Sequence, residues 1–330
     1  MRAIQVDEFG GPDVLRLIEA PAPEPGPGQV SIDVAYAGVN FAELKARSSG
    51  YRVPALPFRP GLEVSGVIRA VGPEVPAEYG LRPGLPVAAI TLFGGYAEVA
   101  VVDAGRVFPL PAGVPLRSAA ALPVVLPTAR ALLHEVGRLT PGETVLVQSA
   151  AGGVGGTVAQ LARAAGAARV LGVVSSAAKA EYAERTGYDQ VFVGPDFAEQ
   201  VRKATDGRGV DLALDPVGGD SLRQSLAALT PFGRLVSFGN ASGEPDWQTG
   251  LADLVPGRSV AGFSVFGLAQ SAPAALRALV EAAFRQAADG AVDPLISAEL
   301  PLEQAAEAHR LIESRSTTGK LLLAVAPTAA

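Results

Sequence analysis

A glycine-rich segment, Val145–Gly156, carries the strongest chemical motif of the chain and reads VLVQSAAGGVGG. An apolar run enters it and a helical pattern leaves it, and its small residues would let the backbone approach a ligand closely. Against a G-x-G-x-x-G pattern, Ala150, Gly152 and Gly155 hold the three glycine positions. A helix N-terminus here would offer free N–H groups and partial positive charge to a pyrophosphate. A tight strand–helix turn would need similar residues, but the βαβ context favours dinucleotide binding.

The end of the next predicted strand indicates which dinucleotide is bound. An NAD site usually has Asp or Glu there, about 20 residues beyond the turn, to hold the ribose 2′-hydroxyl. This chain instead has Ser175, Ser176 and Lys179 and no carboxylate. Two hydroxyls and an ammonium suit a 2′-phosphate, which a carboxylate would repel. We therefore predict NADPH, with the alternative that Lys179 is a solvated helix residue.

Metal and thiol chemistry lack the residues that they need. The chain has no cysteine, which excludes disulfides, Cys-ligated zinc and Cys-ligated iron–sulfur clusters. Its two histidines, His134 and His309, lie far apart in helix-like segments, and we interpret each as a surface or packing residue. No G-x-S-x-G elbow supports a serine hydrolase. We predict no metal site.

Hydride transfer remains, because the cofactor supplies the reactivity and the protein needs only to position the acceptor and stabilise its developing charge. Without a metal, the donors would be Asn40, Tyr51 and backbone N–H groups. A quinone or enone suits such a site, since hydride addition gives a delocalised anion that needs little local stabilisation. Two structural interpretations stay open: Asn40 as the cap of a helix that begins at Phe41, and Glu63 as a buried structural carboxylate.

Three regions of different texture must position these residues. Residues 1–122 read as short strands cut by turns, as in a small barrel or sandwich. Residues 123–266 alternate strands with helices, which indicates a doubly wound parallel sheet. Residues 267–330 are mixed, and we expect them to pack on the first region, so that the Rossmann domain is an insertion.

The expected elements follow from these textures. In the first region the strands are Ala3–Val6, Val30–Tyr36, Glu63–Val71 and Tyr96–Val102. In the second they are Thr144–Gln148, Arg169–Val174, Gln190–Val193, Val210–Leu214, Arg234–Phe238 and Val260–Phe266, with helices at Gly155–Ala165, Ala177–Arg185, Phe197–Ala204 and Ser221–Leu229. The tail has helices at Pro273–Ala288 and Leu302–Glu313 and a strand at Lys320–Val325.

The composition limits the kinds of partner and the location that we expect for this protein. The chain has 330 residues, 48% of them hydrophobic, and a net charge of −6. The absence of a basic stripe argues against nucleic-acid binding. No apolar run reaches the roughly 18 residues of a membrane span, and no signal peptide is visible, so we expect a cytoplasmic protein.

Several segments together resemble the zinc-independent quinone oxidoreductase branch of the medium-chain dehydrogenase/reductase superfamily. They are Gly10–Leu15, Ala37–Phe41, Pro60–Val67, Ala150–Gly155, Asp215–Gly218, Ser237–Gly243 and Arg315–Lys320. Zinc members have histidine where this chain has Leu62. The resemblance implies a Rossmann domain inserted in a GroES-like β-rich catalytic domain and a homodimer formed through 260–266. It also implies cofactor contacts by Asn40, Phe41, Thr128, Gly152, Gly153, Val154, Ser175, Ser176, Lys179, Val217, Phe238, Gly239, Asn240, Ser264, Val265 and Lys320, the last near the phosphates.

The same residues bear on three other functions. An enoyl-thioester reductase of the same superfamily would need a channel for a long acyl carrier. An NADPH-binding protein with little catalysis would need the same cofactor residues. A zinc alcohol dehydrogenase is opposed by Leu62 and by the absence of cysteine. We expect an NADPH-dependent reductase of a quinone or enone.

Overall fold

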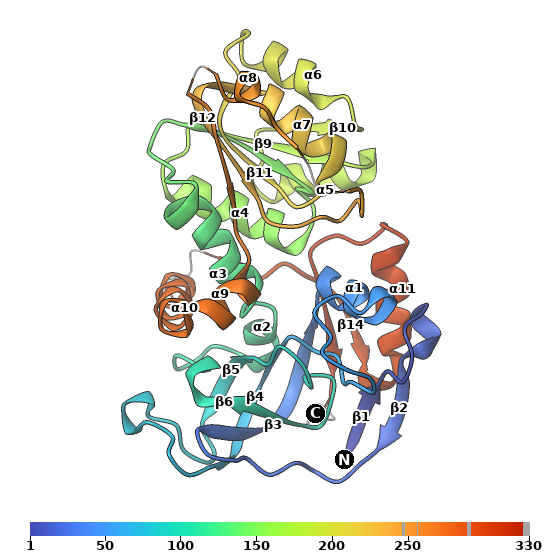
Figure 1. Ribbon diagram of the computed structural model, residues 1–330. Helices are drawn as coiled ribbons and strands as arrows, with labels where there is room; N and C mark the ends of the chain where they lie inside the picture. The colour runs from blue at the N-terminus through green and yellow to red at the C-terminus, as the bar shows by residue number, and fades with distance from the viewer. Residues whose placement is uncertain (246–247, 256, 289–291, 326–330) are drawn as a thin grey trace. The chain divides into compact units, whose positions relative to one another are not determined.

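The computed structural model describes residues 1–245, 248–255, 257–288 and 292–325. The chain forms two compact units, whose elements are labelled in Figure 1. Unit 1 contains residues 1–124, 273–281 and those from 296 onward, and unit 2 contains residues 125–272 and 282–295. The first and last parts of the chain therefore share a unit. Residues 282–295 belong to unit 2, although the sequence suggested that the whole tail would pack on the first region.

Unit 1 is built on a β-sheet that is antiparallel except at one edge. Its order is β14 (Ile296–Pro301), β15 (Lys320–Ala324), β3 (Gln29–Val39), β4 (Glu63–Val71), β5 (Pro86–Ile90) and β7 (Val107–Pro109), and β6 (Val99–Asp103) also pairs with β3. Only the β14–β15 pair is parallel. A hairpin of β1 (Arg2–Gln5) and β2 (Arg16–Glu19) is separate. Ile32, Ile68 and Ile90 are buried in this unit.

The helices of unit 1 are short. They are α1 (Phe41–Ser49), α2 (Leu116–Ala120) and α11 (Ala305–Glu313), with 3-10 turns η1 (Pro12–Val14), η2 (Ala77–Tyr79), η3 (Ala104–Arg106) and η5 (Leu302–Gln304). The predicted helix Leu302–Glu313 is thus a 3-10 turn followed by an α-helix. α10 (Pro273–Ala288) contributes residues to both units.

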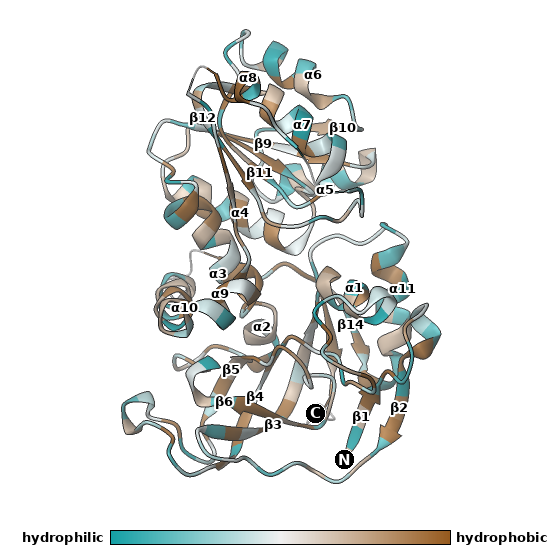
Figure 2. Ribbon diagram, viewed as in Figure 1, coloured by the Kyte–Doolittle hydropathy of each residue, from teal (hydrophilic) through white to brown (hydrophobic). Residues whose placement is uncertain are grey.

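Unit 2 contains a parallel sheet of order β10 (Gln190–Val193), β9 (Arg169–Val174), β8 (Thr144–Gln148), β11 (Val210–Asp215), β12 (Leu229–Ser237) and β13 (Ser259–Gly262). This is the doubly wound order that the alternating pattern predicted. The helices are α3 (Val125–Arg130), the π-helix η4 (Ala131–Val136), α4 (Gly153–Ala164), α5 (Ala177–Arg185), α6 (Phe197–Ala204), α7 (Gly219–Ala227), α8 (Leu251–Leu254) and α9 (Val265–Ser271). Figure 2 shows hydrophobic residues along these strands, as expected for a sheet with helices on its faces.

The predicted last strand, Val260–Phe266, is wrong over its second half. β13 ends at Gly262, and α9 begins at Val265. The side chain of Ser264 accepts a hydrogen bond from the Gly267 N–H at 3.2 Å. This N-cap converts an apolar run that reads as a strand into the start of a helix.

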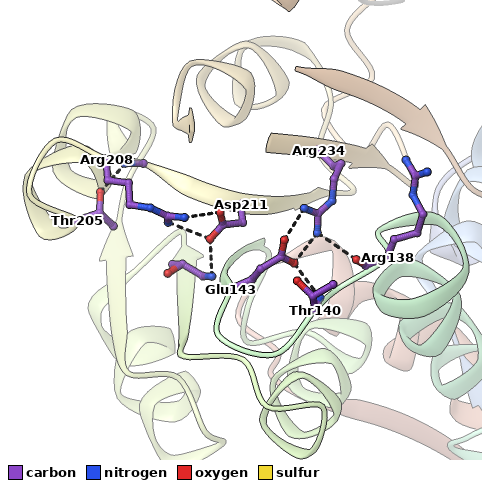
Figure 3. Close-up of polar contacts among 9 residues, drawn as sticks. Arg138, Thr140, Glu143, Thr205, Arg208, Asp211 and Arg234 are labelled. Atoms are coloured by element: carbon purple, nitrogen blue, oxygen red, sulfur yellow. Dashed lines mark hydrogen bonds and ion pairs between the residues drawn. The ribbon is translucent and has the colours of Figure 1, made fainter. Parts of the chain in front are cut away.

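Two arginine–carboxylate pairs fix the amino ends of the central strands of unit 2 (Figure 3). Arg234 donates from Nη1 and Nη2 to the two oxygens of Glu143, at 2.7 and 2.6 Å. Arg208 donates in the same way to Asp211, at 2.9 and 2.6 Å. Asp211 also accepts the Thr144 N–H at 2.8 Å, which connects β11 to β8. This edge is the one opposite to the glycine-rich turn.

Candidate active site

The glycine-rich turn follows β8 and opens α4. Gly152 is the N-cap, with φ −83° and ψ 173°. A Cβ on Gly155 would lie 2.5 Å from the Ser149 carbonyl oxygen, so only glycine fits there, whereas a Cβ on Gly152 would meet that oxygen at 3.2 Å. The Tyr188 hydroxyl donates to the Gly155 carbonyl at 2.7 Å and holds the turn. The third glycine of the motif is therefore required by the fold itself.

The residues predicted to meet a 2′-phosphate lie at the end of the neighbouring strand. Ser175 and Ser176 are exposed immediately after β9, and Ser176 is the N-cap of α5. Lys179 lies half-buried in the first turn of that helix. Positions 173–180 contain no carboxylate. The carboxyl ends of parallel strands share one edge, so these side chains and the glycine-rich turn lie on the same edge of the sheet.

A buried carboxylate organises the next turn along this edge. Asp215, at the end of β11, accepts hydrogen bonds from the N–H groups of Val217 (2.7 Å) and Gly218 (2.8 Å). It also accepts from the hydroxyls of Ser221 (2.8 Å) and Ser225 (3.1 Å). Burial raises the pKa of Asp215, although these four donors oppose that effect. Asp215 thus has a structural role, which fixes the backbone at Val217.

The loop after β12 is tied to that turn. Phe238 N–H donates to the Asp215 carbonyl at 2.9 Å, and Ala241 N–H donates to the Pro216 carbonyl at 3.0 Å. A Cβ on Gly239 would lie 2.8 Å from the Pro216 carbonyl oxygen. The predicted cofactor residues of this loop are Phe238, Gly239 and Asn240, and the structure brings them together with Val217. Phe238 is half-buried, and Gly239 and Asn240 are exposed.

The remaining predicted cofactor residues of unit 2 differ in accessibility. Thr128 is buried in α3. Ser264 uses its hydroxyl to cap α9, and the neighbouring Val265 is buried. The Phe263 N–H donates to the Ser237 carbonyl at 2.9 Å, so this segment begins at the carboxyl end of β12.

In unit 1, the Asn40 side chain contacts a buried ion pair. Its Oδ1 accepts a hydrogen bond from the Lys320 ammonium, and its Nδ2 donates to Glu63 Oε1 at 2.9 Å. Lys320 is ion-paired with Glu63, and the two side chains are 3% and 0% exposed. Glu63 Oε2 accepts the Val124 N–H at 2.7 Å. Lys320 was predicted to approach the cofactor phosphates, but Glu63 and Asn40 engage its ammonium within unit 1.

The backbone of Asn40 belongs to a second network that the sequence did not predict. Its N–H donates to Glu43 Oε2 at 2.6 Å, and Glu43 Oε1 accepts the Leu62 N–H at 2.7 Å. The Tyr96 hydroxyl donates to Glu43 at 3.0 Å, and His309 Nε2 lies 3.3 Å from that hydroxyl. The Asn40-x-x-Glu43 spacing is a capping-box pattern and was the available signal. His309 is fully buried, so it is a packing residue, not a surface one.

The other two predicted residues of unit 1 lie outside these networks. Phe41 is 43% exposed at the start of α1, and Tyr51 is 48% exposed. The Tyr51 hydroxyl accepts a hydrogen bond from Arg52 Nε at 3.0 Å, and the guanidinium lies 5.3 Å from the ring centre. Asn40 also precedes α1, as its capping interpretation requires, but its side chain bonds to Glu63 and Lys320.

The residues that the structure describes contain neither a metal cluster nor a membrane-spanning helix. No group of three or more His, Cys, Asp or Glu side chains there is arranged to hold a metal ion. None of the helices there has both the length and the apolar character needed to cross a membrane.

Comparisons with known proteins give a consistent result. Residues 26–112 match the alcohol dehydrogenase GroES-like domain, and residues 153–281 match the zinc-binding dehydrogenase family. A probable quinone oxidoreductase of Schizosaccharomyces pombe is 36% identical over 97% of this chain and 96% of its own. The synaptic vesicle membrane protein VAT-1 homolog of Danio rerio is 34% identical over 99% of this chain and 70% of its own. The crystal structure of Escherichia coli quinone oxidoreductase complexed with NADPH has a TM-score of 0.90 and 30% identity, covering 98% of this chain and 100% of that one.

Proposed function

This chain belongs to the quinone oxidoreductase family of the medium-chain dehydrogenase/reductase superfamily, and we propose that it transfers a hydride from NADPH to a small quinone or α,β-unsaturated carbonyl compound without zinc. One observation carries the proposal. The glycine-rich turn, the carboxylate-free end of β9 and the paired loops after β11 and β12 lie along one edge of the parallel sheet. Ligands of open α/β sheets bind at that edge. The domain roles are part of the proposal: unit 1 is the catalytic domain and unit 2 binds the cofactor, so residues 267–272 and 282–295, which the sequence assigned to the catalytic domain, belong to the cofactor-binding unit.

The residues of unit 2 fit NADPH. The N–H groups of Gly153 and Val154, in the first turn of α4, would hold the pyrophosphate. Ser175, Ser176 and Lys179 would hold the 2′-phosphate, because hydroxyls and an ammonium donate where a carboxylate would repel. Val217 and the loop 238–240 would border the nicotinamide half.

The chemistry proposed for unit 1 is hydrogen bonding to the acceptor oxygen. NADPH supplies the hydride when it is bound. The Asn40 amide has a second N–H besides the one given to Glu63, and that N–H would stabilise the developing oxyanion. Lys320 and Glu63 hold this amide in one orientation, since they bond to its two ends. A solvent proton would complete the reduction. Tyr51 is the second proposed donor.

The proposal is tested by following NADPH and NADH oxidation with menadione and with a simple enone. NADPH should be oxidised much faster than NADH. Lys179→Ala should raise the KM for NADPH roughly tenfold and leave that for NADH nearly unchanged, since one charged contact is worth about 1.5 kcal/mol. Lys203→Ala, at an exposed position of α6, is the matched control. A wild-type protein that prefers NADH would overturn the cofactor assignment.

A second function is compatible with the same residues. An NADPH-binding protein with little catalysis would need the same cofactor contacts and is the alternative. The VAT-1 homolog of Danio rerio, whose name states no enzymatic activity, is 34% identical to this chain, against 36% for the S. pombe oxidoreductase. Tight NADPH binding in calorimetry, with no turnover of either acceptor, would favour this alternative. A homodimer that uses residues 260–266 and a cytoplasmic location are further parts of our proposal, and light scattering would test the first.

A further inference from the structure

Glu43 is a buried carboxylate that accepts three hydrogen bonds from three different parts of unit 1. The donors are the Asn40 N–H and the Tyr96 hydroxyl at Oε2, and the Leu62 N–H at Oε1. Glu43 is 1% exposed. Three donors that meet two oxygens match an ionised carboxylate, which accepts only. A protonated carboxyl would bring a fourth hydrogen into the cluster and leave one donor without an acceptor.

The chain of contacts continues from Glu43 to His309. Because the Tyr96 hydroxyl donates to Glu43, its oxygen is left to accept from His309 Nε2, 3.3 Å away. The fully buried His309 has no partner at Nδ1 among the described residues. If the neutral ring carries its proton on Nε2, Nδ1 is an unpaired acceptor. That costs less than the other tautomer, in which Nδ1 would be a buried N–H donor without a partner. Tyr96 thus supports the carboxylate, and His309 supports Tyr96.

The charged groups that act on Glu43 and His309 come from three elements. Lys320 of β15 attracts the ionised form of Glu43, and Glu63 of β4 repels it. Arg47 of α1 disfavours a charge on His309 of α11. Burial raises the pKa of Glu43 to about 7, against the lowering effect of Lys320 and of the Asn40 and Leu62 N–H groups. The carboxylate therefore changes its charge near neutral pH, while burial lowers the pKa of His309 to about 3 and keeps that ring neutral.

We propose that Glu43 is a positioning residue for Asn40, whose backbone it holds only while it is ionised, and that Tyr96 and His309 keep its carboxylate in place. Glu43 connects the start of α1 to Leu62, next to Glu63, so it sets the spacing between the two residues that share the amide contact. A proton on Glu43 loosens that spacing. The inference rests on the proposed function, because it takes Asn40 to act on the acceptor.

The test is the pH profile of kcat/KM with NADPH and menadione, from about pH 5 to about pH 9. In the wild type, kcat/KM should fall as the pH drops through about 7. Glu43→Gln should abolish this acidic limb of the profile, because the Gln side chain does not titrate. It should also lower kcat roughly tenfold above about pH 7, because the Gln amide N–H groups face one of the N–H or O–H donors that Glu43 accepts from. Tyr96→Phe should move the limb to higher pH, since the ionised carboxylate loses one donor. NADPH affinity should stay the same in both variants.

Two controls and one spectroscopic readout separate positioning from a general loss of structure. Glu78→Gln and Tyr79→Phe make the same chemical changes in η2, where Glu78 is exposed, and should keep the wild-type profile. Infrared difference spectroscopy should show the C=O stretch of a protonated carboxyl as the wild type is acidified through about pH 7, and not in Glu43→Gln. If Glu43→Gln does not fold, Tyr96→Phe, which keeps the ring, decides the matter.

The outcomes are distinguishable. A wild-type limb that persists in Glu43→Gln, or one that Tyr96→Phe leaves in place, overturns the positioning role. An infrared titration in a wild type that oxidises no NADPH with either acceptor shows that Glu43 titrates, while the proposed function fails. If the wild type turns over but its kcat/KM does not fall near neutral pH and no carboxyl C=O band appears there, the inference is wrong and the proposed function stands.

Discussion

Lys320 and Glu63 form an ion pair that is almost completely withdrawn from water, with the side chains 3% and 0% exposed. Asn40 bonds to both members, so each charged group has a neutral partner as well as the opposite charge. Such a pair adds little net stability, but removing one member leaves an uncompensated buried charge.

The first prediction concerns that pair. Lys320→Met should lower the free energy of unfolding by about 3–5 kcal/mol, because Glu63 then lacks its cation. The double variant Lys320→Met, Glu63→Gln should recover part of the loss. Urea unfolding measures both, and Lys203→Met, at an exposed site, is the control. A wild-type unfolding curve for the single variant would contradict the buried position of the pair.

The two glycines of the cofactor turn should respond differently to alanine. Gly155→Ala should destabilise unit 2, since its Cβ would lie 2.5 Å from the Ser149 carbonyl oxygen. Gly152→Ala has an ordinary φ of −83° and a looser 3.2 Å contact, so the fold should survive. NADPH affinity should fall in both, because a methyl at Gly152 occupies the face that a pyrophosphate approaches. Thermal unfolding and calorimetric titration separate the effects, and equal melting temperatures for the two variants would refute the distinction.

The Arg234–Glu143 pair of Figure 3 should stabilise unit 2 in a pH-dependent way. Burial raises the pKa of Glu143, but the hydrogen bonds from Arg234 and Thr140 lower it by more, so that this pKa lies below its ordinary value of 4.5. Its stabilisation is therefore present above that value and is lost as the pH falls through the folded-state pKa. Arg234→Met should lower the free energy of unfolding by about 1–3 kcal/mol at neutral pH.

The matched control for this pair is Arg223→Met, because Arg223 and Asp220 form an exposed pair with side chains 58% and 57% exposed. Exposed pairs contribute almost nothing, so this variant should unfold like the wild type. If both variants lose the same stability, the Arg234 pair owes nothing to its partial burial.

Glu43 and His309 should have opposite effects on acid stability. The pKa of Glu43 is raised from 4.5 to about 7, so its contribution to stability is complete below 4.5 and is lost as the pH rises through about 7. The pKa of His309 is lowered from 6.5 to about 3, so its contribution is present above 6.5 and is lost as the pH falls through about 3. Between pH 4.5 and 6.5 the two slopes oppose each other.

Single variants should uncover each slope. His309→Gln should make unit 1 less sensitive to acid than the wild type, and Glu43→Gln should make it more sensitive. Melting temperatures measured from about pH 4 to about pH 8 would show this as curves that diverge from the wild type in opposite directions. Curves that run parallel to the wild type would mean that neither group has a shifted pKa.

The parallel sheet could be predicted because its signals are local. The bounds of β8, β9 and β10 agree with the predicted strands, since each is a short apolar run between turns. β5, β7 and β14 were not predicted. β14 alternates half-buried with exposed residues at an edge, and its pairing with β15 depends on residues far along the chain. The prediction of a strand over Val260–Phe266 failed in its second half because the side-chain cap at Ser264 starts a helix there despite the apolar pattern.

The candidate site was predictable where one motif carries it and not where distant residues meet. Gly152, Ser175 and Asp215 lie at or just after the ends of β8, β9 and β11, which are neighbours in the sheet. Glu43, Tyr96 and His309 come from three separate segments, and no local pattern links them. The family resemblance placed Lys320 near the cofactor phosphates. In the structure Lys320 is ion-paired with Glu63, and this contact depends on the register of β15 beside β3.

The position of β15 also affects how the protein is made. β15 lies inside the sheet of unit 1, between β14 and β3, and holds Lys320 next to Asn40. All of unit 2 is synthesised before this strand, while β3 and β4 have already left the ribosome. Until the strand arrives, residues 36–39 of β3 lack their hydrogen-bond partner in β15 and the Glu63 carboxylate lacks its cation. The whole sheet of unit 2 is synthesised earlier, so we expect a nascent chain to acquire a folded Rossmann sheet before the proposed site around Asn40 is complete.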